Sequence, residues 1–193
     1  MKSRQYTMTA RAEAAQETGE RILAAALARF TIEYYDDVTL DEIAADANVT
    51  VQTVIRRFGS KDGLVRSLIT TVTPQVAGQR GEAPVGDIDG TAANLVEHYE
   101  QMGDMVMLLV RQEERVPAYA EATAVGKRYH SDWVRTVFAP WLDARQGVER
   151  GRLHAQLVAT CDVFTWYLLR RQQGLSRRQT ELALIELLEG VLS

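Results

Sequence analysis

The stretch VTVQTVIRRFGSKDGL, residues 49–64, decides the fold of the first part of this chain. Its first half alternates β-branched and polar residues, which is typical of a half-buried strand. A lone strand between two capped helices would leave its backbone groups without partners, and strand propensity spans only ~1 kcal/mol. A helix over 51–58 instead separates an apolar face (Val51, Val54, Ile55 and Phe58) from a polar face (Gln52, Thr53, Arg56 and Arg57). We therefore predict a short helix with a free polar side.

Capping signals on both sides of this segment predict its neighbours. Thr39, followed by a glutamate three residues later, forms a capping box that opens a helix over LDEIAADA. Asn48 tolerates a positive φ and suits the tight turn that follows. Thr50 and Ser60 are candidate N-caps of the next two helices. Helix, short turn and second helix with an exposed polar face is the helix-turn-helix arrangement.

The residues before this motif predict one more helix. Lys2, Arg4 and Arg11 make the first dozen residues basic, and we expect residues 1–17 to form a loose arm that could reach along the minor groove. From Thr18, a candidate N-cap, the run RILAAALARF places its apolar side chains on one helical face.

The remainder of the chain also reads as helical. Residues 78–90, rich in glycine and acidic residues, are predicted to be a loop. Further helices are expected over about 91–112, over 117–143 as one or two helices, over 151–172 and over 176–192. We predict an all-α protein, with a helix-turn-helix domain over residues 1–70 and a helical bundle over residues 71–193.

The composition and the lack of a catalytic motif disfavour an enzyme. The 193 residues carry a net charge of −4, so any basic surface must be local. Cys161 is the one cysteine and is expected as a buried core thiol, which favours a reducing, cytoplasmic setting. No apolar run could cross a membrane, and no phosphate-binding loop, nucleophile elbow or metal-ligand spacing occurs. The sequence predicts no enzyme, no cofactor and no metal.

The polar face of the 51–58 helix has the chemistry of a DNA reader. Glutamine can pair with adenine through two hydrogen bonds, threonine offers a hydroxyl and a methyl group, and arginine can bind guanine or phosphate. Lys61, at the start of the next helix, would grip a phosphate. The predicted DNA-binding residues are Thr39, Thr50, Gln52, Thr53, Arg56, Arg57 and Lys61. The alternative is a solvated face on a helical interaction or structural bundle that does not bind DNA.

Residues 18–68 resemble the N-terminal domain of the tetracycline-repressor (TetR) family of transcriptional regulators. The helix order, the Thr39 cap and the closing F-G-S-K-x-x-L carry the resemblance. It implies a homodimeric repressor whose C-terminal domain binds a small molecule and thereby releases operator DNA. The family usually has glycine at Asn48 and near Tyr34, a phosphate-binding tyrosine at Ile55, and histidine at Arg57. The arginine could replace the lost phosphate contact.

The last two predicted helices are candidates for the dimer interface. The final helix carries apolar residues around most of its surface, namely Leu182, Ala183, Leu184, Ile185, Leu187, Leu188, Val191 and Leu192. The helix over 151–172 has a similar stripe that includes Leu157, Cys161, Phe164 and Leu168. Two such helices from each chain would make a four-helix interface. The alternative is a monomer in which both helices are simply buried.

A ligand pocket among the middle helices is the expectation that depends most on the resemblance. Methionines can adapt to varied ligands, although they fill ordinary cores more often. The candidate ligand-binding residues are His98, Tyr99, Met102, Met105, Trp133, Val137 and Phe164. The expected effector is small and largely apolar, and its binding would move the fourth helix and so separate the two recognition helices.

Overall fold

The computed structural model describes the backbone of residues 2–193 and the side chains of residues 12–193. Over these residues the chain is helical and contains no strand, which confirms the all-α prediction. The elements are α1 (Lys2–Phe30), α2 (Leu40–Asp46), α3 (Val51–Phe58), α4 (Lys61–Gly81), α5 (Ile88–Val110), α6 (Pro117–Val137), α7 (Ala139–Asp143), α8 (Gly147–Thr160), α9 (Val163–Tyr167), the π-helical segment η1 (Leu168–Gln172) and α10 (Arg177–Leu192).

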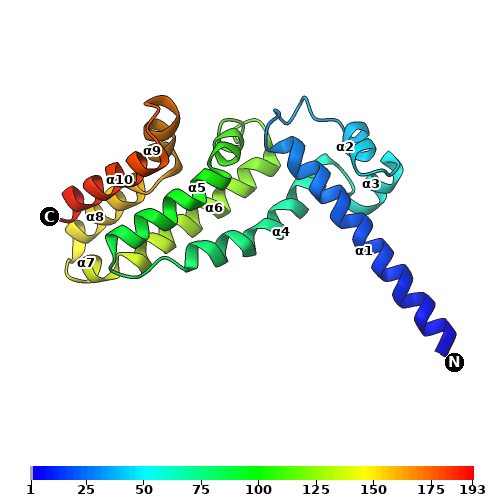
Figure 1. Ribbon diagram of the computed structural model, residues 1–193, viewed down its shortest axis with the longest axis horizontal. Helices are drawn as coiled ribbons and strands as arrows, with labels where there is room; N and C mark the ends of the chain where they lie inside the picture. Colours follow the sequence, from blue (N-terminus) through cyan, green and yellow to red (C-terminus); the bar gives the residue numbers. More distant parts are fainter. Residues whose placement is uncertain (1) are drawn as a thin grey trace.

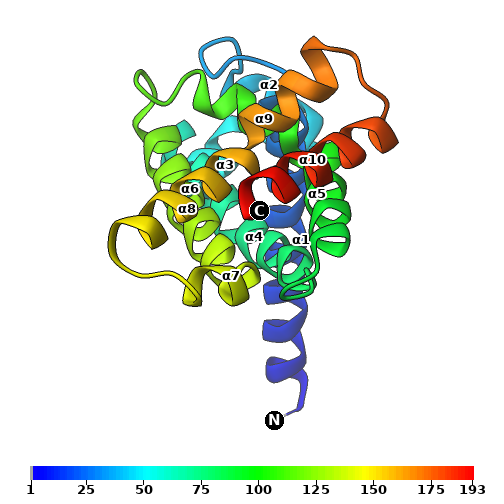
Figure 2. The ribbon, with the colours of Figure 1, turned by 90° about the vertical axis from the view of Figure 1, so that its left-hand side faces the viewer.

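The helices form an elongated molecule with two distinct ends. Figure 1 shows α2 and α3 beside α1 at one end, and α8 and α10 with the C-terminus at the other. The long helices α4, α5 and α6 lie between these ends. Figure 2 views the molecule from the second end, with α8, α9 and α10 toward the viewer. The short helix α3 is therefore far from the C-terminal helices.

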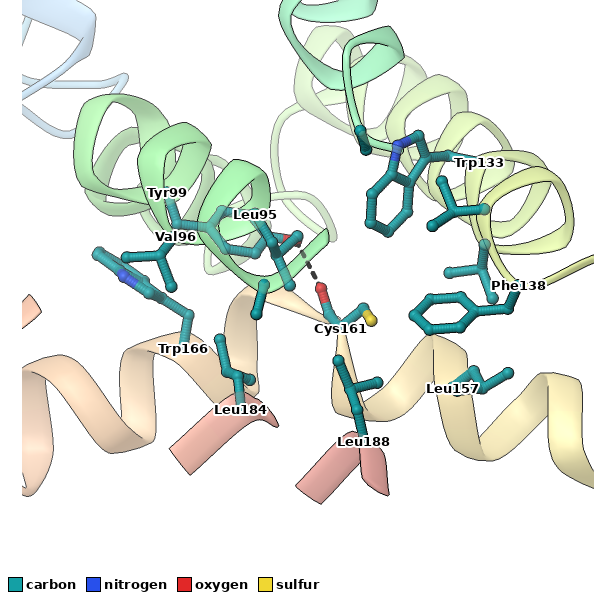
Figure 3. Close-up of a cluster of buried hydrophobic side chains, with 14 of the residues drawn as sticks. Leu95, Val96, Tyr99, Trp133, Phe138, Leu157, Cys161, Trp166, Leu184 and Leu188 are labelled. Carbon is teal, nitrogen blue, oxygen red and sulfur yellow. Dashed lines mark hydrogen bonds between the residues drawn. The ribbon is translucent and has the colours of Figure 1, made fainter. Parts of the chain in front are cut away.

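Two apolar clusters hold these helices together. The first joins α1, α2, α3 and the first half of α4, and it also includes side chains that surround the start of α6, among them the buried Tyr119. The second joins α5 to α10, with Trp166 and Leu184 fully buried (Figure 3). There the Tyr99 hydroxyl donates a hydrogen bond of 3.0 Å to the Cys161 carbonyl. Cys161 is buried as predicted, and burial raises the pKa of its thiol to about 12.

The local capping signals form as the sequence predicts. The Thr39 hydroxyl accepts a hydrogen bond from the Glu42 amide at 3.2 Å, and the Glu42 carboxylate accepts one from the Thr39 amide at 2.9 Å. Thr50 and Ser60 cap α3 and α4 in the same way through their hydroxyl oxygens. Asn48 has a φ of 53°, the left-handed conformation expected for the turn between α2 and α3.

The expected loose arm is wrong for residues 2–17, which are the first turns of α1. Alanines at positions 12, 14 and 15 favour the helix, since alanine has the highest helix propensity. Thr18 is not an N-cap, because its hydroxyl donates to the Ala14 carbonyl one turn back, at 2.8 Å. The side chains of Lys2, Arg4 and Arg11 lie outside the described residues.

Two other boundaries differ from expectation. The helix predicted over 151–172 is broken after Thr160, because the Asp162 carboxylate accepts a hydrogen bond from the Phe164 amide and starts α9. Phe164 and Leu168, assigned to an apolar stripe of that helix, are half exposed as a result. Of the predicted loop 78–90, residues 78–81 belong to the last turn of α4 and residues 88–90 to the first turn of α5.

Candidate nucleic-acid interface and ligand cavity

The polar face of α3 is exposed at one end of the molecule (Figure 1). Val54 is buried against α1 and α2 and anchors the helix, while Gln52 and Arg56 are exposed. Ile55 was predicted on the apolar face, but 39% of its surface is exposed. The buried stripe of this short helix follows positions i, i+3 and i+7, so that Ile55 falls beside it. An outward polar surface with one apolar side chain is the result.

The two arginines of α3 have different surroundings. The guanidinium of Arg57 donates a hydrogen bond of 2.7 Å to the Ala15 carbonyl of α1. It lies over Gly19, where a Cβ atom would come within 2.3 Å of the Arg57 guanidinium. Arg56 is exposed and makes no hydrogen bond or ion pair with another described residue. Arg57 thus fastens α3 to α1, whereas Arg56 is open to a partner.

Lys61 also makes contacts that the sequence did not indicate. Its ammonium group donates to the carbonyls of Tyr35 and Val38, at 2.6 and 2.7 Å, and lies 4.2 Å from the centre of the Tyr35 ring. The Tyr35 hydroxyl in turn donates to the Asp62 carboxylate. Lys61 therefore ties the segment between α1 and α2 to the start of α4. Its predicted phosphate contact stays a prediction.

A cavity of about 260 Å³ lies between α1, α4, α5, α6 and the turn from α8 to α9. Five of the predicted ligand-binding residues line it, namely His98, Tyr99, Met102, Met105 and Phe164. Trp133 and Val137 are not in its wall but are buried in the second apolar cluster. The wall also includes residues of the first two long helices, which sequence reasoning assigned to ordinary core: Leu27 and Phe30 from α1, and Val65 and Leu68 from α4.

The polar part of the cavity centres on Arg80, in the last turn of α4. Only 3% of this residue is exposed. Its guanidinium carbon lies 3.8 Å from the ring centre of Trp133, and one terminal nitrogen lies 3.4 Å from His130 Nδ1. Burial, together with the charge of Arg80, lowers the pKa of His98 to about 3 and also lowers the pKa of His130. Both histidines are therefore neutral at physiological pH.

Sequence reasoning missed Arg80 because it lies in a stretch rich in glycine and acidic residues that resembles a loop. Only the three-dimensional packing brings it against the aromatic rings. Within the described residues, no group of three or more His, Cys, Asp or Glu side chains could hold a metal ion. In the same part of the chain, no helix is long and apolar enough to span a bilayer.

Residues 22–68 match the family model described as bacterial regulatory proteins, tetR family. Among solved structures, a transcriptional regulator from Rhodococcus sp. Rha1 superposes with a TM-score of 0.71 at 18% identity, over 90% of this chain and 95% of that one. A transcriptional regulator from Aquifex aeolicus VF5 has a TM-score of 0.63 at 17% identity, over 90% and 99% of the two chains.

NalD, the secondary repressor of the MexAB-OprM multidrug efflux pump in Pseudomonas aeruginosa, has a TM-score of 0.61 at 17% identity, over 92% of this chain and 97% of that one. These likenesses extend the shared fold over nearly the whole chain. No curated protein matches the sequence.

Proposed function

We propose that this chain, whose residues 22–68 match the family model of bacterial regulatory proteins of the tetR family, is a repressor that binds operator DNA as a homodimer and is released by a small-molecule effector. The observation that carries the DNA-binding part is the exposed polar face of α3, held by the buried Val54. A free polar face on the second helix of a helix-turn-helix fits the major groove.

In this proposal some residues of α3 and its neighbours contact DNA, and others hold the helices in place. Gln52 reads a base edge, and Arg56 binds guanine or a phosphate. Thr50 and Thr53, whose hydroxyl oxygens are 3.0 Å apart, stand at the start of the helix, where base contacts are expected, and Thr39 begins the helix before it. Arg57 and Lys61 act chiefly by holding α3 and α4 in place, since both already bind backbone carbonyls.

The dimer is supported by exposed apolar side chains on α8 and α10, two helices that lie at the end of the molecule opposite α3 (Figures 1 and 2). Val148 of α8 is 83% exposed, and Leu182 and Leu187 of α10 are 41% and 44% exposed. Large apolar side chains gathered on two neighbouring helices are typical of an interface. We propose that α8 and α10 of two chains form it, with twofold symmetry that brings two copies of α3 to successive major grooves.

The cavity supports the effector part of the proposal. Its wall combines residues of α1 and α4, which carry the helix-turn-helix, with residues of α5 and α6. A ligand that binds one arrangement of these helices better than the other shifts the population toward that arrangement. The movement of α4 would then change the distance between the two copies of α3.

The test begins with an operator selected from a random pool of DNA duplexes by the full chain. Binding should weaken steeply between low and moderate salt, because phosphate contacts release counterions. Gln52→Ala and Arg56→Ala should each weaken binding by roughly 1–3 kcal/mol if they contact bases. Arg128→Ala, on an exposed residue of α6, is the matched control and should bind as the parent does. If the chain enriches no duplex, or if the double variant Gln52→Ala/Arg56→Ala binds DNA as tightly as the parent, then the polar face of α3 does not contact DNA.

A further inference from the structure

The cavity contains a buried positive charge that the described protein leaves without a counter-charge. From it we infer that the effector is an amphipathic monoanion, whose carboxylate binds Arg80 and whose apolar body lies against α1 and α4. This inference deepens the proposed function and rests on it for the consequence of binding, the release of DNA. The binding itself can be measured without DNA.

Arg80 is buried to an extent that is unusual for an arginine. It is 97% inaccessible, and an arginine side chain is charged throughout the physiological pH range. Among the described residues, no carboxylate lies within 4 Å of its guanidinium, and its Nε atom has no hydrogen-bond partner. A charge buried without a partner costs several kcal/mol, and such groups are normally paired.

The neighbouring side chains do not neutralise this charge. His98 and His130 are neutral, and His130 presents Nδ1 toward Arg80 while its Nε2 lies 3.1 Å from the Val158 carbonyl. Asp162 is the one acidic residue in the described wall, and its carboxylate caps α9 by accepting from the Phe164 amide at 3.0 Å. Lys127 also lines the cavity, but its ammonium group is paired with the Glu113 carboxylate at 2.7 Å. Arg80 is therefore the one cation in the described wall that an incoming anion can pair.

The geometry around Arg80 favours a carboxylate. Trp133 covers one face of the guanidinium plane, so an anion would pair with its edge, which carries the unpartnered Nε. An edge with two N–H donors matches the two oxygens of a carboxylate. A single buried cation also matches a single negative charge, whereas a dianionic phosphate would leave one charge unpaired in an apolar site.

The rest of the wall sets the size and polarity of the ligand body. It consists mainly of aliphatic and aromatic side chains such as Leu27, Val65 and Leu109. The volume of about 260 Å³ is near the lower end of ligand pockets, which are about 300–1,000 Å³. An alkyl chain of medium length attached to the carboxylate meets both conditions, with its tail toward α1 and the first half of α4.

The experiment compares three probes with one alkyl chain and different head groups, namely decanoate, decan-1-ol and decylammonium. Each is titrated calorimetrically into the full chain without DNA, below the critical micelle concentration of the two ionic probes and below the solubility limit of decan-1-ol. Decanoate should bind at least tenfold more tightly than decan-1-ol, and decylammonium should bind most weakly. Arg80→Gln should lower the affinity for decanoate to that for decan-1-ol, and Arg128→Gln on the surface of α6 should leave it unchanged.

The outcomes separate the inference from the proposed function. Decanoate that binds the unaltered chain no better than decan-1-ol, or not at all, overturns the inference even if Arg80→Gln fails to fold. So does a folded Arg80→Gln variant that keeps the preference for decanoate. Decanoate that binds through Arg80 but leaves operator DNA bound contradicts the effector role and leaves the site standing. If the unaltered chain binds no DNA duplex but still binds decanoate through Arg80, the proposed function is contradicted and the inferred site is not.

Discussion

Replacing Lys61 by methionine distinguishes a phosphate contact from a structural one. Methionine keeps the apolar stem of the side chain and removes the ammonium group. The carbonyls of Tyr35 and Val38 then lose their hydrogen bonds of 2.6 and 2.7 Å, and the Tyr35 ring loses a cation 4.2 Å from its centre. If these contacts are the main role of Lys61, the variant should be less stable before any DNA is added.

The magnitude follows from the groups that are left unpaired. A buried acceptor without a partner costs about 1–3 kcal/mol, and a cation–π contact contributes about 0.5–1 kcal/mol at an accessible site. Lys61 is only half-buried, so that water can reach part of the vacated space. The expected loss is therefore about 2–3 kcal/mol. For a chain of this size it corresponds to a melting temperature lower by about 4–12 °C.

Two measurements decide the matter, the melting temperature by circular dichroism and the operator affinity at several salt concentrations. Loss of one phosphate contact would lower the slope of log K against log salt by about 0.9. The structural role predicts a lower melting temperature and an unchanged slope. The control Lys127→Met removes an exposed ion pair of 2.7 Å with Glu113 and should cost less than about 1 kcal/mol. An unchanged melting temperature with a reduced slope would refute the reasoning.

Three further predictions concern packing, assembly and pH. Gly103→Ala places a Cβ atom 2.4 Å from the buried ring of Trp166, whereas a Cβ atom at Gly78 meets nothing within 4 Å. Urea denaturation should therefore show that Gly103→Ala is less stable than Gly78→Ala by about 1–3 kcal/mol. Equal stabilities of the two variants would contradict the contact. Leu187→Glu should convert the proposed dimer to a monomer in light scattering, and a variant that stays dimeric would place the interface elsewhere. Burial lowers the pKa of His98 from 6.5 to about 3, so the unfolded chain binds a proton that the folded chain does not, and stability falls as the pH drops below 6.5. Between pH 6.5 and 5 the contribution of His98 to this loss should be about 1–2 kcal/mol, and His98→Gln should lose less stability by that amount, while the contribution of His130 remains. The same pH dependence in both proteins would show that His98 makes no such contribution.

The features that the sequence predicted correctly are local. The Thr39 capping box, the Thr50 and Ser60 caps and the positive φ of Asn48 each depend on a few neighbouring residues. Such signals depend on residues within one turn of a helix, so they can be recognised in the sequence without knowledge of the tertiary structure. They were sufficient to predict α3 as a helix in spite of its strand-like alternation.

The features that the sequence did not predict depend on distant parts of the chain. Arg57 meets the Ala15 carbonyl across 42 positions, and Arg80 meets His130 across 50. Apolar periodicity also continues through the break at Asp162, because the stripe of side chains does not reveal that a carboxylate has restarted the helix. A cavity is harder still to predict from the sequence, because the residues that line it show the same apolar periodicity as the residues that fill a core.

The single helix α4 connects the proposed DNA-binding site to the proposed ligand site. Ser60 caps its first turn and Arg80 lies in its last turn, so that one helix of 21 residues connects the start of the DNA-binding end to the buried charge. At 1.5 Å per residue such a helix spans about 30 Å. The ion pair of 2.7 Å between Arg66 and Glu121 fastens its first half to α6. In the proposed mechanism, an anion bound to Arg80 would act on the end of α4 that lies far from the DNA-binding end, and a rotation of this helix would change where α3 lies.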